Sequence, residues 1–98
     1  MVEWSIPAKQ DLKQIHDYIA RDSVFYAEKV VEEIVEKSEI LNDYPEIGRI
    51  VPELGDKNIR QLLIYSYRLI YENMHSEIII LAVISSKQDF PSYKFTKS

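Results

Sequence analysis

The spacing of apolar residues changes near residue 45, from about every third or fourth position to about every second. The first part predicts two amphipathic helices, over residues 8–21 and 23–43, joined by a tight turn. The stripe of the first helix is Ala8, Leu12, Ile15 and Ile19. The stripe of the second is Ala27, Val30, Val31, Ile34 and Leu41. If the two helices form a hairpin that covers a sheet, Ile15, Ile34 and Leu41 must be shielded from water.

The second part of the chain predicts strands. Residues 59–65, 67–74 and 77–85 are rich in β-branched and aromatic residues, and residues 73–76 form the turn between the last two. The opening stretch VEWSI also indicates a short strand, and residues 50–51 a short extended piece. We therefore predict an α+β fold: an N-terminal strand, then a helical hairpin packed on one face of an antiparallel β-meander.

Composition limits the class of protein. The 98 residues suffice for one domain, assigned to residues 1–98. The longest apolar run, at residues 78–84, is too short to span a bilayer, and the first 20 residues contain no signal-peptide core. The chain has no cysteine, which excludes disulfides and thiolate metal sites. A cytoplasmic location is expected.

The net charge of −4 is unevenly distributed. Residues 1–47 contain five Lys or Arg against eleven Asp or Glu, whereas residues 48–98 contain seven against five. Nucleic-acid binding requires positive charge, which the net charge does not favour. The two halves have either different tasks or merely different solvent-exposed faces.

Several kinds of site are absent from the sequence. Only Gly48 and Gly55 are present, so no glycine-rich phosphate loop exists. The two histidines, His16 and His75, lie on different predicted elements and have no metal-ligand spacing. We expect neither a cofactor nor a metal.

Basic residues form the remaining constellation: Arg49, Arg60, Arg68 and Lys87. Neighbouring antiparallel strands lie about 5 Å apart, so side chains on one face of the meander can converge. The alternative is that these charges simply protect the solvent-exposed face and edges of the sheet.

Four stretches together resemble the RelE/ParE toxin family, known from plasmid stabilisation systems. They are A-x-x-DL-x-x-I-x-x-YIA-x-DS (residues 8–23), YPEIGRIVPEL (44–54), IRQLLIYSYRLIYE (59–72) and IIILAV (78–83). The resemblance covers nearly the whole chain in order. It implies the toxin of a type II toxin–antitoxin pair, a growth inhibitor neutralised by a cognate antitoxin in a hetero-oligomer.

The family divides by target, and the resemblance leaves three functions open. RelE-like members cleave mRNA on the ribosome, ParE-like members inhibit DNA gyrase, and a degenerate member would bind only its antitoxin. If the chain is an endoribonuclease, the catalytic candidates are Arg68, Arg60, Lys87 and Glu53. The binding candidates are Arg49, Arg60, Arg68, Tyr71, Lys87 and Tyr93.

One departure from the nuclease pattern favours the gyrase inhibitor. Many nuclease members follow the last core strand with a His-Gly-Arg-Arg-like run, where this chain has Ser85, Ser86, Lys87 and Gln88. Serine does not titrate near neutral pH, and lysine lacks the bidentate fork of arginine. The resemblance therefore favours a ParE-like toxin that does not cleave RNA.

The antitoxin is predicted to fold a disordered, amphipathic segment onto this chain. Apolar residues that a small core leaves exposed motivate this prediction: Trp4, Phe25, Tyr26 and the aromatic tail at residues 90–98. The tail itself is expected to fray unless a partner holds it.

Overall fold

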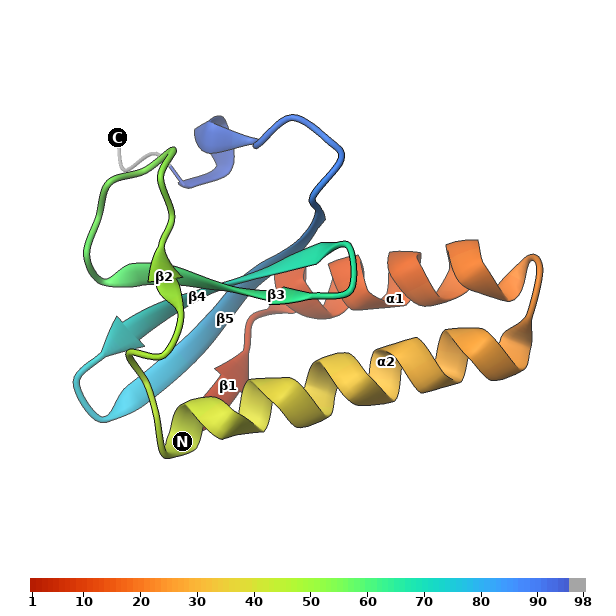
Figure 1. Cartoon of the computed structure of the whole chain (residues 1–98), viewed down its shortest axis with the longest axis horizontal. Helices are drawn as coiled ribbons and strands as arrows, with labels where there is room; N and C mark the ends of the chain where they lie inside the picture. The colour runs from red at the N-terminus through yellow and green to blue at the C-terminus, as the bar shows by residue number, and fades with distance from the viewer. Residues whose placement is uncertain (96–98) are drawn as a thin grey trace.

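The computed structural model describes residues 1–95 as two helices on a five-stranded sheet (Figure 1). The strand order is β1-β5-β4-β3-β2. The elements are β1 (Val2–Trp4), α1 (Ile6–Ala20), α2 (Val24–Glu39), β2 (Arg49–Ile50), β3 (Ile59–Ile64), β4 (Tyr67–Met74) and β5 (Glu77–Ser85), with short 3₁₀ helices at Ile40–Asn42 and Ser92–Phe95. None of the helices within residues 1–95 is long and apolar enough to cross a membrane.

Serine caps start both helices. The Ser5 hydroxyl accepts a hydrogen bond from the Ala8 N–H (3.2 Å), and Pro7 lies in the first turn, where its missing N–H costs nothing. The Ser23 hydroxyl accepts a bond from the Tyr26 N–H (3.1 Å). The two caps fix where the helices begin and therefore how the hairpin turns between them.

The strands form the predicted antiparallel meander, with one addition. Strands β3, β4 and β5 pair antiparallel through two-residue turns. Strand β1 pairs with β5 in parallel, so the complete sheet is mixed. Strand β2 adds only two residues at the opposite edge, where Arg49 pairs with Gln61 and Ile50 with Arg60.

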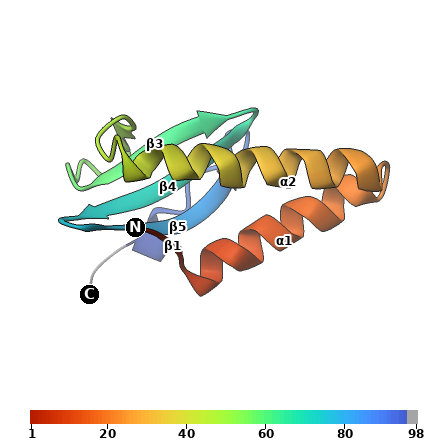
Figure 2. The ribbon, with the colours of Figure 1, turned by 90° about the horizontal axis from the view of Figure 1, so that it is seen from below.

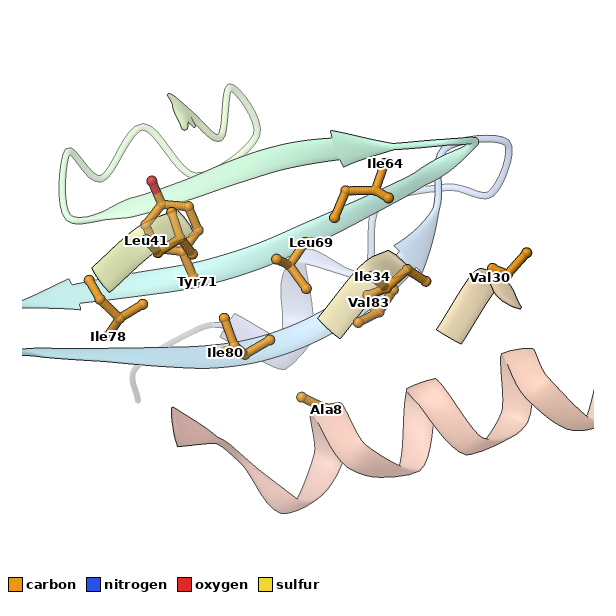
Figure 3. Packing of buried hydrophobic residues seen from close by; sticks show 10 residues of the cluster. All are labelled: Ala8, Val30, Ile34, Leu41, Ile64, Leu69, Tyr71, Ile78, Ile80 and Val83. Atoms are coloured by element: carbon orange, nitrogen blue, oxygen red, sulfur yellow. The ribbon is translucent and has the colours of Figure 1, made fainter. Parts of the chain in front are cut away.

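The main core lies between the helices and one face of the sheet, as Figures 2 and 3 show. Its buried members are Ala8, Val30, Ile34, Leu41, Ile64, Leu69, Tyr71, Ile78, Ile80 and Val83. Ile34 and Leu41 have no exposed surface, and Ile15 packs against this cluster while remaining partly accessible. The predicted packing of the helical hairpin is therefore confirmed.

A second apolar cluster covers the opposite face of the sheet. Its buried residues are Val51, Ile59, Ile70, Ala82 and Ile84. Phe90 and Phe95 pack against them and stack on each other with ring centroids 5.3 Å apart. Figure 1 shows this C-terminal segment on the side of the sheet away from the helices. We call this side the tail face.

Two expectations from the sequence need correction: that the C-terminal tail is frayed and that Trp4 is exposed. Phe90 and Phe95 of the predicted frayed tail pack on the sheet, because they cover apolar residues that the helices do not reach. The rest of the predicted frayed tail, residues 96–98, lies outside the described residues. Trp4 is half-buried against the main core, so it is a weaker candidate for an exposed contact than Phe25 (76% exposed) or Tyr26 (50%).

Candidate functional site

Arg68 lies at the centre of a polar cluster on the tail face. Its Nη1 and Nη2 donate to the two carboxylate oxygens of Glu53 at 2.9 and 2.7 Å. Its Nε donates to Oε1 of Gln61 at 2.8 Å. The guanidinium carbon lies 4.8 Å from the centroid of the Phe90 ring. The guanidinium is thus held by a bidentate ion pair, an amide and an aromatic face.

The register of the meander explains this cluster. Arg68 pairs with Leu63 on β3 and with Ile84 on β5, so its side chain shares the tail face with Ile84. Glu53 reaches Arg68 from the loop after β2, where the Leu54 and Gly55 N–H groups both donate to the Val51 carbonyl. That turn folds the VPEL stretch back over the sheet.

The ion pair with Arg68 lowers the pKa of Glu53. The hydrogen bond from Arg68 holds the pKa of Glu53 below its ordinary value of 4.5, and the nearby charge of Arg49 acts in the same direction. Glu53 is thus ionised at neutral pH and neutralises Arg68. Gln61, which accepts the hydrogen bond from the Nε of Arg68, is only 5% exposed.

Arg60 does not join Arg68. It pairs with Tyr71, whose side chain belongs to the main core, so Arg60 and Arg68 lie on opposite faces. The Nη1 of Arg60 donates to the carbonyl oxygens of Gly48 (2.9 Å) and Glu46 (3.3 Å). The expectation that the arginines converge on one face is therefore wrong for this pair, and Arg60 ties the loop before β2 to the sheet.

Tyr71 was also predicted to be a binding residue, but it is buried. Its side chain has no exposed surface. Its hydroxyl donates to the Pro45 carbonyl (2.8 Å) and accepts from the Gly48 N–H (3.0 Å), and burial raises its pKa. A Cβ on Gly48 would lie 2.6 Å from this hydroxyl, so the glycine allows the loop to approach the tyrosine. Tyr71 is a core residue that anchors the loop.

The other three candidates remain accessible. Arg49 is exposed on β2 and pairs with Gln61, which places it on the same face as Arg68. Lys87 is exposed after β5 and lines a cleft between α1, the end of β5 and the C-terminal segment. Tyr93 is 76% exposed. These side chains can contact a partner without any rearrangement.

Sequence reasoning missed Gln61 and Phe90 as partners of Arg68. A signal for Gln61 existed, because a polar residue alternating with buried apolar residues on β3 has to find a hydrogen bond. Phe90 carried no such signal, since it follows the last strand in a segment without periodicity. Within residues 1–95, no group of three or more His, Cys, Asp or Glu side chains could hold a metal ion.

Comparisons with known proteins agree with the fold. The sequence model of the "ParE toxin of type II toxin-antitoxin system, parDE" matches residues 2–90. A solved structure of the chromosomal ParDE toxin–antitoxin system from P. aeruginosa superposes with a TM-score of 0.72. It is 25% identical, over 86% of this chain and 92% of that chain. No curated protein matches the chain. The resemblance seen in the sequence is thus confirmed: the chain belongs to the ParE family, the toxins of type II toxin–antitoxin systems.

Proposed function

We propose that this toxin inhibits DNA gyrase by binding it, that it does not cleave RNA, and that a cognate antitoxin neutralises it. The proposal rests on the contacts that the Arg68 side chain makes. The strand arginine that a nuclease would use for the scissile phosphate is already paired with the Glu53 carboxylate at 2.7 and 2.9 Å.

An RNA-cleaving site needs free cations and proton carriers. Cations must hold the scissile phosphate and the charge of the transition state, and titrating groups must move protons to and from the reacting oxygens. A phosphate that takes the place of the Glu53 carboxylate on the Arg68 guanidinium has to break both hydrogen bonds of this ion pair. Breaking a bidentate pair at a side chain that is only 13% exposed opposes that exchange.

The remaining candidates do not replace Arg68. Arg60 lies on the opposite face and is bonded to backbone carbonyls. Lys87 follows Ser85, which occupies the place of the family histidine and does not titrate near neutral pH. His16 lies on α1 beside Asp17, and His75 lies in the turn between β4 and β5. The cluster around Arg68 therefore favours a structural role.

Surface chemistry supports a partner-binding toxin. Large apolar side chains remain exposed on the helical hairpin, among them Phe25 (76%) and Val24 (58%). An amphipathic antitoxin segment can cover such residues and stabilise the bound form. The ParDE structure similar to this chain is itself a toxin–antitoxin system.

Induction of the chain alone in a bacterium tests this proposal. We expect growth arrest with DNA damage and filamentation, and intact mRNA. Coexpression of the product of the adjacent gene should restore growth, because the antitoxin withdraws the toxin. Lys87→Ala is the comparison variant: any mRNA cleavage that depends on Lys87 should disappear in it, and we expect intact mRNA with both proteins.

Two other results would each replace the proposal. Arrest with mRNA cut on ribosomes, lost in Lys87→Ala, would establish a RelE-like nuclease. Normal growth at a verified level of folded protein would establish a degenerate member that only binds its antitoxin.

A further inference from the structure

A cleft of about 560 Å³ lies where α1, the end of β5 and the segment after β5 meet. Ile15 lines it from α1, and Tyr67 and Ser85 line it from the sheet. Lys87 and Lys94 line it from the segment after β5, which turns back over the tail face (Figure 1). We call this depression the lysine cleft.

The cleft forms where β1 no longer covers β5. Strand β1 pairs with β5 only as far as Ile80, and beyond this point α1 packs beside the strand. The Ser5 hydroxyl, at the start of α1, donates to the Leu81 carbonyl (3.4 Å). Farther along α1, Oδ2 of Asp11 accepts a hydrogen bond from the Val83 N–H (3.0 Å). Side chains therefore replace a strand at this edge, and the cleft remains open beside them.

The cleft carries positive charge that the fold does not neutralise. Lys87 and Lys94 are exposed, and within residues 1–95 no ion pair joins either of them to a carboxylate. Asp11 is the only acidic residue among the described residues that line the cleft, and it already accepts the bond from Val83. Elsewhere the hairpin is acidic, since residues 1–47 contain eleven Asp or Glu against five Lys or Arg. The lysine cleft therefore favours a ligand with negative charge.

The rest of the lining favours a peptide over a nucleic acid. Gln14 and Gln88 bring amide groups that can donate to and accept from a peptide backbone, and Ile15 and Pro91 add apolar surface. A DNA or RNA strand would bring its further phosphates against the acidic hairpin, which opposes binding. A peptide segment can instead place single carboxylates at the two lysines.

From this geometry we propose that the lysine cleft binds an extended, acidic segment of the antitoxin, whose carboxylates pair with Lys87 and Lys94. The inference rests on the antitoxin of the proposed function and not on the gyrase target. A disordered segment can enter such a cleft and become ordered as it binds. Because Asp11 already occupies the Val83 N–H, the segment is recognised by its side chains and does not join the sheet as a further strand.

Binding of the purified product of the adjacent gene to toxin variants, measured by calorimetry, tests the inference. Lys87→Glu and Lys94→Glu should each weaken binding. The double variant should weaken it by about tenfold or more, because each glutamate sets a like charge against the antitoxin. Lys57→Glu is the matched control for the single variants. It makes the same change of charge at an exposed lysine in the loop before β3, outside the cleft, and should bind like the wild type.

A neutral pair of substitutions separates charge from packing. Lys87→Gln/Lys94→Gln removes the attraction without adding repulsion, so it should weaken binding less than the double glutamate variant does. If the lysine stems merely packed against the antitoxin, the two double variants would weaken binding equally, which would contradict pairing with carboxylates. All variants should melt at the temperature of the wild type, since both lysines are exposed. Should the glutamate variants fail to fold, wild-type affinity in the glutamine variant would overturn the inference.

The salt dependence of binding gives a second readout of charge. Raising the salt concentration from about 50 to about 200 mM should reduce the difference in affinity between the wild type and the double glutamate variant, because salt screens exposed charges. A difference that does not change with salt would contradict the charge pairing.

A short single-stranded oligonucleotide, used in place of the antitoxin, tests the other anionic class of ligand. We expect it not to bind to the cleft. Binding that the double glutamate variant loses and Lys57→Glu keeps would assign the lysine cleft to a nucleic acid and overturn the inference.

Failure of the inference can be told from failure of the proposed function. If the wild type binds the product of the adjacent gene and the double glutamate variant binds it equally well, the lysine cleft is not a contact surface. If the wild type itself does not bind this product, the antitoxin part of the proposed function is wrong. Neither measurement involves gyrase.

Discussion

Arg68 is a catalytic candidate if the chain is a nuclease, yet an ion pair and a further hydrogen bond tie its side chain into the fold. Its side chain is 13% exposed, and its hydrogen bonds join β4 to the loop after β2 and to Gln61 on β3. The guanidinium also covers the Phe90 ring of the C-terminal segment. One side chain thus connects three parts of the tail face.

Arg68→Ala should therefore destabilise the protein. We expect a loss of about 2 kcal/mol, because Gln61 and Glu53 lose their partner and Phe90 loses a packed face. The free energy of unfolding, measured by urea denaturation, checks this. Arg68→Lys keeps the charge without the bidentate fork and should restore only part of the loss. Stability equal to the wild type in Arg68→Ala would contradict the structural role.

The ion pair should also make stability depend on pH. Because Arg68 holds the pKa of Glu53 below 4.5 in the folded protein, the pair stabilises the fold above pH 4.5. That stabilisation is lost as the pH falls below 4.5 through the folded-state pKa. Wild type and Glu53→Gln should therefore differ in unfolding free energy at about pH 6, and the difference should shrink as the pH falls below 4.5. A difference that stays constant over this range would show that the charge of Glu53 is not what stabilises the fold.

At the scale of elements, the periodicity of apolar residues predicted the type and position of both helices and of the three meander strands. The predicted helices at residues 8–21 and 23–43 correspond to Ile6–Ala20 and to Val24–Glu39 with the 3₁₀ turn that follows. The three meander strands agree to within one residue at each end. The parallel pairing of β1 with β5 was not predictable in this way, because local pattern does not encode which distant strand a short strand joins.

The C-terminal segment is the other element that periodicity could not place. It has no regular alternation, and it folds because Ile59, Ile70, Ala82 and Ile84 leave an apolar face open. Its place on the sheet comes from this tertiary packing, while local backbone hydrogen bonds form its short 3₁₀ helix.

The contribution of this segment to stability can be measured with two neighbouring aromatic residues. Phe95→Ala should lower the unfolding free energy by about 1–3 kcal/mol, because Phe95 stacks on Phe90 and packs on the second cluster. Tyr93→Ala, at a position 76% exposed, should leave it unchanged. Equal effects of the two substitutions in thermal or urea unfolding would mean that the segment does not pack on the sheet in solution.

At the scale of the whole molecule, the candidate site was predicted less well than the fold, and turn length shows why. The two-residue turn between β3 and β4 pairs Ile64 with Tyr67, and therefore Leu63 with Arg68 and Arg60 with Tyr71. Leu63 and Arg60 are three positions apart, so Arg60 and Arg68 point to opposite faces. The alternation along one strand shows which of its own side chains lie on the same face. The length of the turn is also needed to tell which residues of the next strand lie on that face.

The whole molecule therefore divides into two working parts. The sheet and its tail face hold Arg68, Glu53 and the C-terminal segment together as structure. The acidic hairpin, on which Val24 and Phe25 are exposed, is the surface that we propose for partners. This division supports our proposal that the toxin acts by binding and does not cleave RNA.

The most direct measurement of that claim uses purified wild-type protein in two parallel assays over the same concentration range. One assay follows supercoiling by DNA gyrase, and the other follows cleavage of a reporter mRNA on translating ribosomes. We expect loss of supercoiling and intact mRNA. Ribosome-dependent cleavage that Arg68→Ala abolishes while the variant remains folded, with supercoiling unaffected by the wild type, would contradict it.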